Sequence, residues 1–409
     1  MNSSHIPGMS LFNPTPPHVM HIDLNSCFAS VEAQANPLLR EKPLAVAAYA
    51  KPYGCILAAS YEAKLYGVKT GMTVKEGREL CPYLVVREPD PDKYRQVHKE
   101  IGQLLSEYTP HPVSKSIDEY CLPLRSLYGE GGSNVRSIAQ EIKDRIKFEI
   151  GDHLRVSVGI STNQILAKLA SGLHKPDGLD VIDKTNYLAI YKKIELQDFC
   201  GINIRNEARL NRVGIFTALE FSQASVQTLK AAFQSVLGRY WYTRLRGYEV
   251  DDVEFARRSF GQSYVLPHPM KQEEWRPILA KLVGKAARRL RRGGYSASGV
   301  HLALRHGDGS HWHTGKAFSV AMEDDKDIMA VALSLYRGVD KPVKKVAVTC
   351  FGLVEKENKQ TGLFEDSAKK RSLVLAMDQV NDKWGEYSLS YGSMMGSAGY
   401  VRDAIAFGK

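Results

Sequence analysis

The sequence HIDLN at residues 21–25 places a carboxylate, Asp23, in an apolar run that is typical of a buried strand. The sequence SIDEY at residues 116–120 carries two more, Asp118 and Glu119, on a second strand-like stretch. A buried strand carries carboxylates only where they are paired or bind a metal, because burying a bare charge is costly. Three clustered carboxylates can hold two Mg²⁺ ions about 4 Å apart, an arrangement that transfers phosphoryl groups. Acidic residues also occur on exposed strands, so each segment alone leaves both interpretations open.

The adjacent pair of carboxylates constrains the second segment. Neighbouring residues of a strand point to opposite faces of a sheet. Asp118 and Glu119 therefore reach one metal pair only if they lie near a strand end or in a turn.

The length and charge of the chain limit what it can be. Its 409 residues exceed one compact core, so we expect about two to four domains. The net charge is +10, and residues 255–320 contribute +9 of it, with twelve Lys or Arg against three Asp or Glu. A basic segment of this kind usually faces a polyanion, although a merely solubilising face has the same composition.

Cysteine use and hydropathy indicate the compartment. The six cysteines are scattered without a Cys-x-x-Cys pair, which argues against a zinc site or a disulfide scaffold and favours a reducing cytosol. The sequence has no signal peptide and no apolar run long enough to span a bilayer. Residues 1–18, which are rich in proline, are expected to form a disordered tail.

Periodicity predicts a mixed α+β arrangement in the first half of the chain. Strands are predicted at 19–24, 113–122 and 154–160, with Asp118 on the second of these, and a further apolar run lies at 44–49. Helical spacing is present at 30–39, at 92–108, after Ser133 with Val135, Ile138, Ile142 and Ile146 on one face, and from Asn163 through Lys168.

Residues 194–237 have short helical spacing and no strand pattern. The sequence FCGIN at 199–203, with the apolar-spaced residues after it, resembles a helix-hairpin-helix, whose tight turn offers backbone N–H groups to a DNA phosphate. Asn203 stands where that turn has a second glycine, and Asn tolerates a positive φ better than most residues. An ordinary helical hairpin has the same pattern, so both interpretations stay open.

From Arg258 onward the chain has the βαββαβ order of a ferredoxin-like unit. The strands are predicted at 259–266, 298–305, 312–319 and 344–353, and the helices at 272–292 and 325–337. One face of the first helix is apolar, and the other carries Lys281, Lys285, Arg288, Arg289, Arg291 and Arg292. A sheet with one buried and one basic face could lie against a duplex backbone.

Three side chains are candidates for contacts to a nucleotide phosphate. Tyr61 and Lys64 are three residues apart on a helical stretch, so they share a face and could together bind a triphosphate. Lys168 follows a strand, a turn and a helix start, where a lysine can meet a phosphate. A solvated helix face explains the same lysines without any ligand.

Phe28 follows the first carboxylate segment, and core packing is its ordinary role. If Asp23 holds a metal at the sugar end of a nucleotide, the ring could instead block a 2′-hydroxyl. Forcing an extra atom into a packed site costs roughly 1–3 kcal/mol. That cost corresponds to discrimination on the order of ten- to a hundredfold.

Several of these segments together resemble the Y-family translesion DNA polymerases, in particular the DNA polymerase IV (DinB) branch. The matching segments are HIDLNSCFASVE at 21–32, ASYEAK at 59–64 with YGV at 66–68, SIDE at 116–119, VGIS at 158–161 and AKLA at 167–170. They stand in the family's order and spacing, and the resemblance covers about residues 19–357.

The resemblance implies a two-metal active site. Asp23, Asp118 and Glu119 match the family's metal-binding carboxylates, and the backbone carbonyl of Leu24 adds a ligand. The expected cofactor is a pair of Mg²⁺ ions, for which Mn²⁺ can substitute. Phe28 matches the steric gate against ribonucleotides. The triphosphate contacts match the backbone N–H groups near Cys27 and Phe28 together with the side chains of Tyr61, Lys64 and Lys168.

The resemblance also implies a right-hand polymerase fold of the α+β class. We expect a ferredoxin-like palm at 19–26 and 91–175, small fingers at 27–90, a helical thumb at 176–250, a linker at 251–257 and a βαββαβ little finger at 258–357. The little finger would grip the template duplex, with DNA contacts from Arg257, Arg258, Lys285, Arg288, Arg289 and Arg305.

Residues 358–409 would form a C-terminal tail. The sequence QTGLF at 360–364 resembles the short peptide by which bacterial polymerases dock on the sliding clamp, here through Gln360, Leu363 and Phe364. A short amphipathic helix of unknown role is expected beyond it, with Leu373, Ala376, Met377, Val380 and Trp384 on its apolar face.

Three positions depart from the family's pattern. Asn25 stands where many relatives have a second Asp, a position that is not a principal metal ligand. Lys64 replaces the more usual Arg and cannot make its bidentate contact, which puts the alignment of the triphosphate in doubt. Ala58 occupies a position often held by Thr and lacks that hydroxyl donor.

The implied activity is error-prone, Mg²⁺-dependent synthesis on primer–template DNA with an incoming dNTP, by a cytoplasmic, nucleoid-associated monomer that docks on the clamp and binds no membrane. Two alternatives remain. A nucleotidyl cyclase also uses paired carboxylates and two metals, but it would not need a basic DNA-binding domain after the catalytic core. A polymerase-like accessory subunit would be expected to lose the carboxylates, and all three are present.

Overall fold

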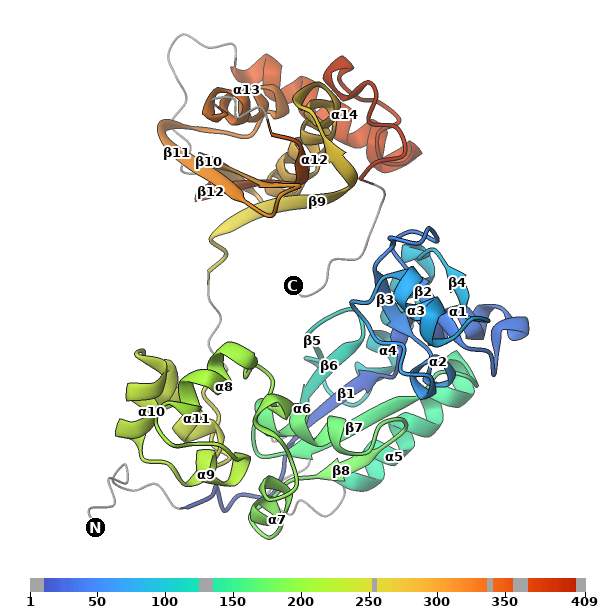
Figure 1. The fold of residues 1–409 in the computed structure, drawn as a ribbon, viewed down its shortest axis with the longest axis vertical. Helices are drawn as coiled ribbons and strands as arrows, with labels where there is room; N and C mark the ends of the chain where they lie inside the picture. The colour runs from blue at the N-terminus through green and yellow to red at the C-terminus, as the bar shows by residue number, and fades with distance from the viewer. Residues whose placement is uncertain (1–10, 125–134, 252–255, 337–340, 356–366, 402–409) are drawn as a thin grey trace. The chain divides into compact units, whose positions relative to one another are not determined.

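The computed structural model describes residues 11–124, 135–251, 256–336, 341–355 and 367–401 (Figure 1). The chain forms two units, the first ending at residue 253 and the second beginning at residue 254. Both combine helices with sheets, which confirms the α+β prediction. Among the described residues, no helix is both long and apolar enough to cross a membrane.

The first unit is built around strand β1 (Val19–Leu24), whose run of buried apolar residues places it at the centre of a sheet. The strand order is β5-β6-β1-β7-β8, with β5 at Val113–Ser114, β6 at Glu119–Pro123, β7 at Val156–Ser161 and β8 at Leu179–Val181. Both neighbours of β1 run antiparallel to it, so β6 and β7 are parallel and separated by β1. The sheet thus extends past residue 175, where we expected the palm to end.

Three helices accompany this sheet. Helix α4 (Pro91–Leu105) begins at the N-cap Asp90, α5 (Val135–Arg145) continues into a π-helical turn at Ile146–Ile150, and α6 (Gln164–Leu173) begins at Asn163. The helices predicted at 92–108 and from Asn163 are therefore confirmed, whereas Ser133 lies outside the described residues. Figure 1 shows α6 across β1 and β7, which it contacts closely.

The strand predicted at 113–122 is wrong in one respect that matters for the site. It is split into β5 and β6, which pair antiparallel around a turn at residues 115–118. The amides of Lys115 and Ser116 donate to the carbonyl of Glu119, which closes the turn. Asp118 therefore lies in the turn rather than on a strand. This is the position from which Asp118 and Glu119 could both reach one metal pair.

A second, smaller sheet has the order β3-β2-β4, with β2 at Leu44–Ala47, β3 at Ile56–Ala59 and β4 at Val85–Arg87. Helix α1 (Cys27–Ala35) leads from β1 to this sheet, and a 3₁₀ turn at Pro37–Leu39 completes the helical stretch expected at 30–39. Helices α2 (Tyr61–Leu65) and α3 (Val74–Leu80) follow β3.

Residues 187–244 are helical, as predicted. The helices are α7 (Tyr187–Tyr191), a 3₁₀ turn at Leu196–Asp198, α8 (Ile204–Asn211), α9 (Ala218–Gln223), α10 (Val226–Phe233) and α11 (Leu237–Arg244). Gly201 adopts a φ of +102°, but Asn203 has a φ of −102° and caps α8 by accepting from the amide of Asn206. The expected positive φ at Asn203 is wrong, because its side chain serves as an N-cap.

The prediction of a disordered tail at 1–18 is wrong for its last residues. Phe12 is buried and stacks on Tyr187 with 4.3 Å between ring centroids. The side-chain amide of Asn13 donates to the carbonyl of Gly247, and its backbone amide donates to the carbonyl of Arg246. The segment at 11–18 thus contacts the helical region that begins with α7. Residues 1–10 lie outside the described part of the chain.

The second unit follows the predicted βαββαβ order. Its elements are β9 (Ser259–Met270), α12 (Gln272–Arg292), β10 (Tyr295–His306), β11 (His311–Met322), α13 (Asp325–Leu335) and β12 (Val343–Glu355). The strand order is β11-β10-β12-β9, and each neighbouring pair is antiparallel. Each helix therefore joins two strands that have another strand between them, the split βαβ arrangement.

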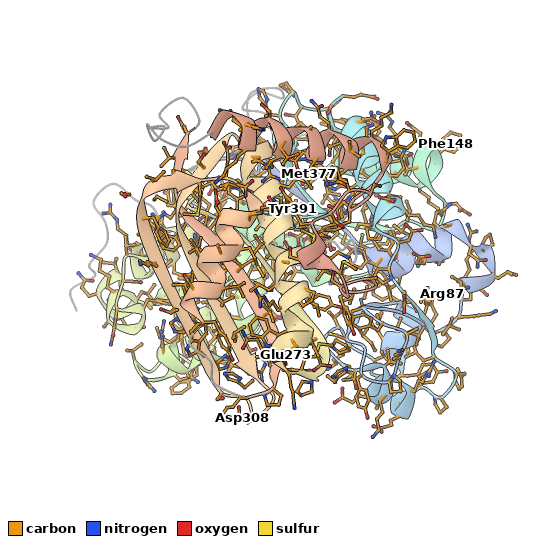
Figure 2. All side chains as sticks on the ribbon, turned by 90° about the horizontal axis from the view of Figure 1, so that it is seen from above. Arg87, Phe148, Glu273, Asp308, Met377 and Tyr391 are labelled. Carbon is orange, nitrogen blue, oxygen red and sulfur yellow. The ribbon has the colours of Figure 1, made fainter. Side chains whose placement is uncertain are left out.

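The C-terminal segment is part of the second unit rather than a tail. Helix α14 (Ser367–Trp384) and a 3₁₀ turn at Gly392–Met394 pack beside α12, with Val374, Met394 and Val401 buried. Figure 2 labels Met377 and Tyr391 in this segment. The amphipathic helix is confirmed, but its expected apolar face is wrong, since Leu373, Val380 and Trp384 are exposed.

Candidate active site

Two of the predicted carboxylates meet at the ends of adjacent strands. Asp23 is directly opposite Glu119 in the antiparallel pairing of β1 with β6. Directly opposite residues on one face lie close enough for their side chains to interact. The fold thereby joins two acidic segments that lie far apart in the sequence.

Each of these two carboxylates forms an ion pair with a lysine side chain. The Nζ of Lys175 lies 2.6 Å from an oxygen of Asp23, and the Nζ of Lys168 lies 2.6 Å from both oxygens of Glu119. Burial raises the pKa of Asp23, while Lys175 opposes that rise. Burial alone would lower the pKa of Lys168, but the hydrogen bonds to Glu119 outweigh it and raise that pKa. The site therefore attracts cations.

Asp118 approaches the same place from the turn. Its carboxylate accepts from the Ser116 hydroxyl at 2.5 Å, and its backbone carbonyl accepts from the amide of Leu24. One pocket is lined by Asp118, Asp23, Phe28 and Lys175 together. The proximity of Asp118 also raises the pKa of Asp23, after the larger effect of burial.

The closest set of metal-ligating atoms is not the predicted one. Ligand atoms of His21, Asp23 and Glu119 all lie within 4.8 Å of one another, and Asp118 is not in that set. His21 is buried on β1, and its Nε2 has no hydrogen-bond partner and lies 3.9 Å from Glu119. Burial, with the charges of Lys168 and Lys175, lowers the pKa of His21 to about 3, so the imidazole is neutral. Sequence reasoning missed this residue, although it begins the HIDLN segment.

The donor set suits a hard divalent cation. Asp23, Asp118 and Glu119 offer carboxylate oxygens, and Mg²⁺ prefers oxygen ligands. The lysine ammonium groups at 2.6 Å occupy the positions that a cation would take beside these oxygens. The residues present thus fit the divalent cations that the sequence motifs predict.

Phe28 lies at the wall of the pocket and is held there by stacking. Its ring is 7% exposed and stacks on Tyr94, with centroids 4.4 Å apart and planes 10° apart. The Tyr94 hydroxyl donates to Glu32 at 2.8 Å. Phe28 therefore packs in the core and also lines the pocket.

Tyr61 and Lys64 share a face of α2, as predicted, and both turn toward the start of α1. The Nζ of Lys64 lies 4.2 Å from the centre of the Tyr61 ring and donates to the hydroxyl of Ser26 at 2.8 Å. Ser26 is the N-cap of α1 with a φ of 49°. The amides of Cys27 and Phe28 are in the first turn of α1, where backbone N–H groups have no intrahelical partner and attract anions.

The departures from the family's pattern have visible consequences. Asn25 is buried, and its Oδ1 accepts from the amide of Asp177 at 2.8 Å and from Ser157 at 3.1 Å. It therefore braces the backbone beside the site. Ala58 lines the pocket with its methyl group. Lys175, which sequence reasoning missed, comes after the end of α6, where no periodicity distinguishes it from an exposed lysine.

In the second unit, the open face of the sheet is basic. Arg305 on β10 is directly opposite His311 on β11 and Lys345 on β12. Arg305 is exposed, while the neighbouring strand residues Leu304 and Leu302 are buried on the opposite face. Arg305 on this open face stays a predicted contact for a duplex backbone.

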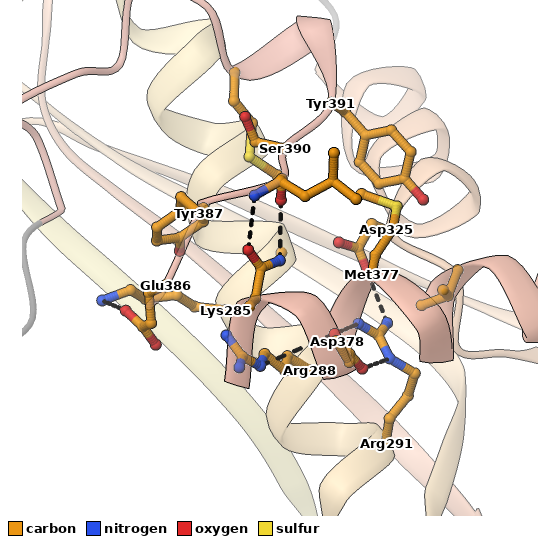
Figure 3. A pocket seen from close by; sticks show the side chains of 15 residues that line it. Lys285, Arg288, Arg291, Asp325, Met377, Asp378, Glu386, Tyr387, Ser390 and Tyr391 are labelled. Atoms are coloured by element: carbon orange, nitrogen blue, oxygen red, sulfur yellow. Dashed lines mark hydrogen bonds and ion pairs between the residues drawn. The ribbon is translucent and has the colours of Figure 1, made fainter. Parts of the chain in front are cut away.

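The basic face of α12, in contrast, is not an open surface. Lys285 lies 3.1 Å from Glu386, and Arg288 lies 3.9 Å from Asp378 (Figure 3). Arg288 also pairs with Asp382. The assignment of Lys285 and Arg288 to DNA contacts is therefore wrong for this arrangement, because the C-terminal segment covers and neutralises them. Sequence periodicity showed a basic stripe but not the chain that covers it.

The other predicted DNA contacts have different surroundings. Arg257 and Arg258 are exposed, and the Arg257 guanidinium lies 4.7 Å from the centre of the Phe260 ring. Arg289 is exposed and donates to the carbonyl of Gly261. Gln360, Leu363 and Phe364 lie outside the described residues.

Comparisons with known proteins agree with this geometry. Models of the impB/mucB/samB family and of its C-terminal domain match residues 22–172 and 257–363. The DNA polymerase IV of Moorella thermoacetica is 35% identical over 380 residues, which are 90% of this chain and 94% of that protein. DNA polymerase IV 1 of Bacillus subtilis is 31% identical over 392 residues, which are 92% of this chain and 93% of that protein.

Solved structures confirm the fold. A Y-family DNA polymerase chimera has a TM-score of 0.72 at 24% identity, covering 82% of this chain and 99% of the other. DinB from Sulfolobus solfataricus has a TM-score of 0.55 at 24% identity, covering 81% of this chain and 98% of the other. The chain therefore belongs to the impB/mucB/samB family and, within the Y-family polymerases, to the DNA polymerase IV (DinB) branch.

Proposed function

We propose that this protein is a template-directed, error-prone DNA polymerase that adds dNTPs to a primer 3′-hydroxyl during translesion synthesis. One observation carries the proposal: Asp23 and Glu119, each bound by a lysine, adjoin a pocket that Asp118, Phe28 and Lys64 also approach. Carboxylates, an aromatic ring and lysine ammonium groups thus converge at one place, and the chain belongs to a family whose curated relatives are named DNA polymerase IV.

Asp23, Asp118, Glu119 and the carbonyl of Leu24 would hold two Mg²⁺ ions, or Mn²⁺ in their place. Such ions lower the pKa of the attacking hydroxyl and neutralise charge on the transferred phosphate and the leaving pyrophosphate. Lys168 and Lys175 would then leave the carboxylates and bind the triphosphate. The exchange keeps the local charge balanced in both states.

The remaining residues of the pocket orient the nucleotide. The first-turn amides of α1 at Cys27 and Phe28 would bind the triphosphate, together with Tyr61 and Lys64 from α2. The Phe28 ring, backed by Tyr94, would block a 2′-hydroxyl. Lys64 contributes a point charge where Arg would make a fork, so it neutralises phosphate without fixing its orientation.

We further propose how the protein is divided and what it binds. Residues 19–26 and 91–181 would serve as palm, 27–90 as fingers, 182–250 as thumb and 258–355 as little finger. Primer–template DNA would lie on the open face of the second unit's sheet, with Arg305 among the phosphate contacts. Residues 360–364 would dock a monomer on the sliding clamp at the nucleoid.

Primer extension tests the proposal. We expect the wild type to extend a primed template with Mg²⁺ and four dNTPs and Asp118→Ala to extend none. Asp92→Ala is the matched control, because that carboxylate lies on the surface of α4 with 92% of its side chain exposed. Failure of both wild type and Asp92→Ala, with DNA binding intact, would favour a non-catalytic accessory subunit.

A further inference from the structure

The turn that carries Asp118 is held from behind by a histidine. His98, on the inner side of α4, places its Nδ1 3.0 Å from the carbonyl oxygen of Ile117, the residue before Asp118. A carbonyl only accepts, so the proton resides on Nδ1, and His98 donates this hydrogen bond. Among the described side chains, this is the hydrogen bond that ties the turn to a helix.

Tyr120 fixes the imidazole in that orientation. Its hydroxyl lies 2.9 Å from Nε2 of His98 and 2.8 Å from the backbone carbonyl of the same residue. The two rings stack with centroids 4.7 Å apart and planes 17° apart. The hydroxyl of Ser114 approaches Nε2 as well, at 3.3 Å. Because Nδ1 carries the proton, Nε2 is an acceptor. The single proton of the Tyr120 hydroxyl goes either to Nε2 or to the His98 carbonyl, and that of the Ser114 hydroxyl goes either to Nε2 or to the Ser116 carbonyl.

Gly102 makes room for this arrangement. It lies one turn after His98 on α4, and a Cβ there would stand 2.7 Å from the Tyr120 hydroxyl oxygen. Glycine inside a helix is destabilising relative to alanine, so the position needs a reason. The close approach of Tyr120 supplies that reason, and the three residues form a matched set.

We propose that His98 is a positioning residue for catalysis: held by Tyr120 over Gly102, it fixes the Ile117 carbonyl and so sets the Asp118 carboxylate for binding metal beside Asp23. The opposite side of the turn is fixed by the amide of Leu24, which donates to the Asp118 carbonyl. The turn is thereby held between the sheet and α4. This inference rests on the proposed function, in which Asp118 is a metal ligand.

Substitutions at His98 separate the donor from the bulk of the ring. In His98→Asn, the side-chain Nδ2 is bonded to Cγ as Nδ1 is, so it can still donate to Ile117. In His98→Gln, the amide lies one carbon further out and cannot occupy that position. We expect Asn to retain wild-type kcat and Gln to lose roughly three- to tenfold, the equivalent of one hydrogen bond.

Metal binding provides a measurement that does not depend on turnover. Calorimetric titration of the full-length protein with Mn²⁺, without nucleotide, should give wild-type affinity for His98→Asn and roughly three- to tenfold weaker affinity for His98→Gln. The KM for dNTP should be unchanged in both, since the triphosphate contacts lie on α1, α2 and α6. A purely structural role would shift the unfolding temperature of both variants and leave Mn²⁺ affinity alone.

Gly102 and Tyr120 give an independent test. Gly102→Ala should weaken Mn²⁺ binding, because the new Cβ displaces the Tyr120 hydroxyl. Adding Tyr120→Phe removes the clashing oxygen and should restore part of the affinity. If Ala at residue 102 leaves the affinity unchanged, or if Asn and Gln at residue 98 behave alike, the positioning role is overturned. Asp118→Ala is measured alongside: if that variant still extends primers, the proposed function fails at its metal site, whatever His98 does.

Discussion

Phe28 illustrates at the scale of one residue how packing can create selectivity. Its ring stacks on Tyr94, whose hydroxyl donates to Glu32, and Lys93 pairs with the same carboxylate at 3.2 Å. A ring held through such a series of contacts cannot move aside for an extra atom. The structure thus shows the core role, and the same rigid packing is what the proposed gate role needs.

Phe28→Ala should raise incorporation of ribonucleotides. Removing the ring opens space at the pocket wall, and we expect discrimination between dNTP and rNTP to fall on the order of ten- to a hundredfold. Single-nucleotide insertion with matched dNTP and rNTP measures the ratio. Phe148→Ala is the control, since that ring is 90% exposed. An unchanged ratio in Phe28→Ala would remove the residue from the gate.

The carboxylate site shows what single residues could and could not reveal. Asp23 and Glu119 were predictable because charges in apolar runs are anomalous whatever the fold. Lys175 was not, because a lysine beyond a helix end has no pattern and its partner Asp23 lies on another element. His21 was missed for a related reason: a histidine in a strand is ordinary until its Nε2 is seen to be buried without a partner.

At the scale of elements, the contact between β7 and α6 depends on one glycine. A Cβ at Gly159 would lie 2.0 Å from the backbone oxygen of Ala167 on α6. Helix and strand therefore approach more closely than any other residue allows. Lys168 is carried on the same helix, so this approach also sets its distance to Glu119.

Gly159→Ala should destabilise the first unit and reduce activity. Overpacking against backbone costs roughly 1–3 kcal/mol, because α6 must move as a whole. Gly172→Ala, on α6 with nothing within 4 Å, is the matched control and should be more stable than wild type by up to about 1 kcal/mol. Urea unfolding measures the free energy of unfolding of both variants and of the wild type. Equal destabilisation of the two would show that the close approach does not matter.

Helix α14 forms ion pairs with the buried cations of α12. Arg291 of α12 is almost fully buried, at 3% exposure, and it makes hydrogen bonds of 2.8 and 2.9 Å to Asp378 (Figure 3). A second carboxylate, Asp325, lies 2.7 Å away. Without α14, α12 would expose a row of cations on the side away from the sheet.

Asp378→Asn should destabilise the second unit by roughly 1.5–3 kcal/mol, because the buried Arg291 loses one carboxylate partner and keeps the other, Asp325. Asp327→Asn breaks an exposed pair with Lys370 at 3.4 Å and should cost no more than about 1 kcal/mol. Thermal unfolding of the full-length protein compares the two. If Asp378→Asn unfolds at the temperature of Asp327→Asn, α14 does not stabilise α12 through this pair.

At the scale of the whole molecule, chemistry and basic surface belong to different units. The carboxylates lie in the first unit, and the open basic sheet face lies in the second. The peptide at 360–364 stands in the sequence between β12 and α14, outside the described residues.

Deleting residues 360–364 should abolish clamp-stimulated synthesis and leave basal synthesis unchanged. The deletion removes the docking side chains without touching the carboxylate site. Primer extension with and without the sliding clamp measures both rates. A replacement of the five residues by Gly and Ser, which keeps the length of the chain, controls for the shortening. Equal stimulation after deletion would show that the clamp docks elsewhere.

Most of the helices and strands, and the carboxylates of the candidate metal site, were predictable from the sequence. Strand β1, helices α4 and α6, and the βαββαβ order of the second unit follow from local periodicity, which side chains on one element impose whatever surrounds them. The anomalous carboxylates and the family motifs likewise needed no coordinates. These features are properties of short segments.

The contacts between those segments were visible in the folded chain alone. The tertiary structure set Asp118 in a turn, because Glu119 closes that turn through its backbone carbonyl. It set Lys175 against Asp23, and it covered Arg288 with α14. A basic stripe looks the same in sequence whether it faces DNA or a neighbouring acidic helix. The physical reason is that burial and ion pairing depend on residues distant in the chain, which no local pattern records.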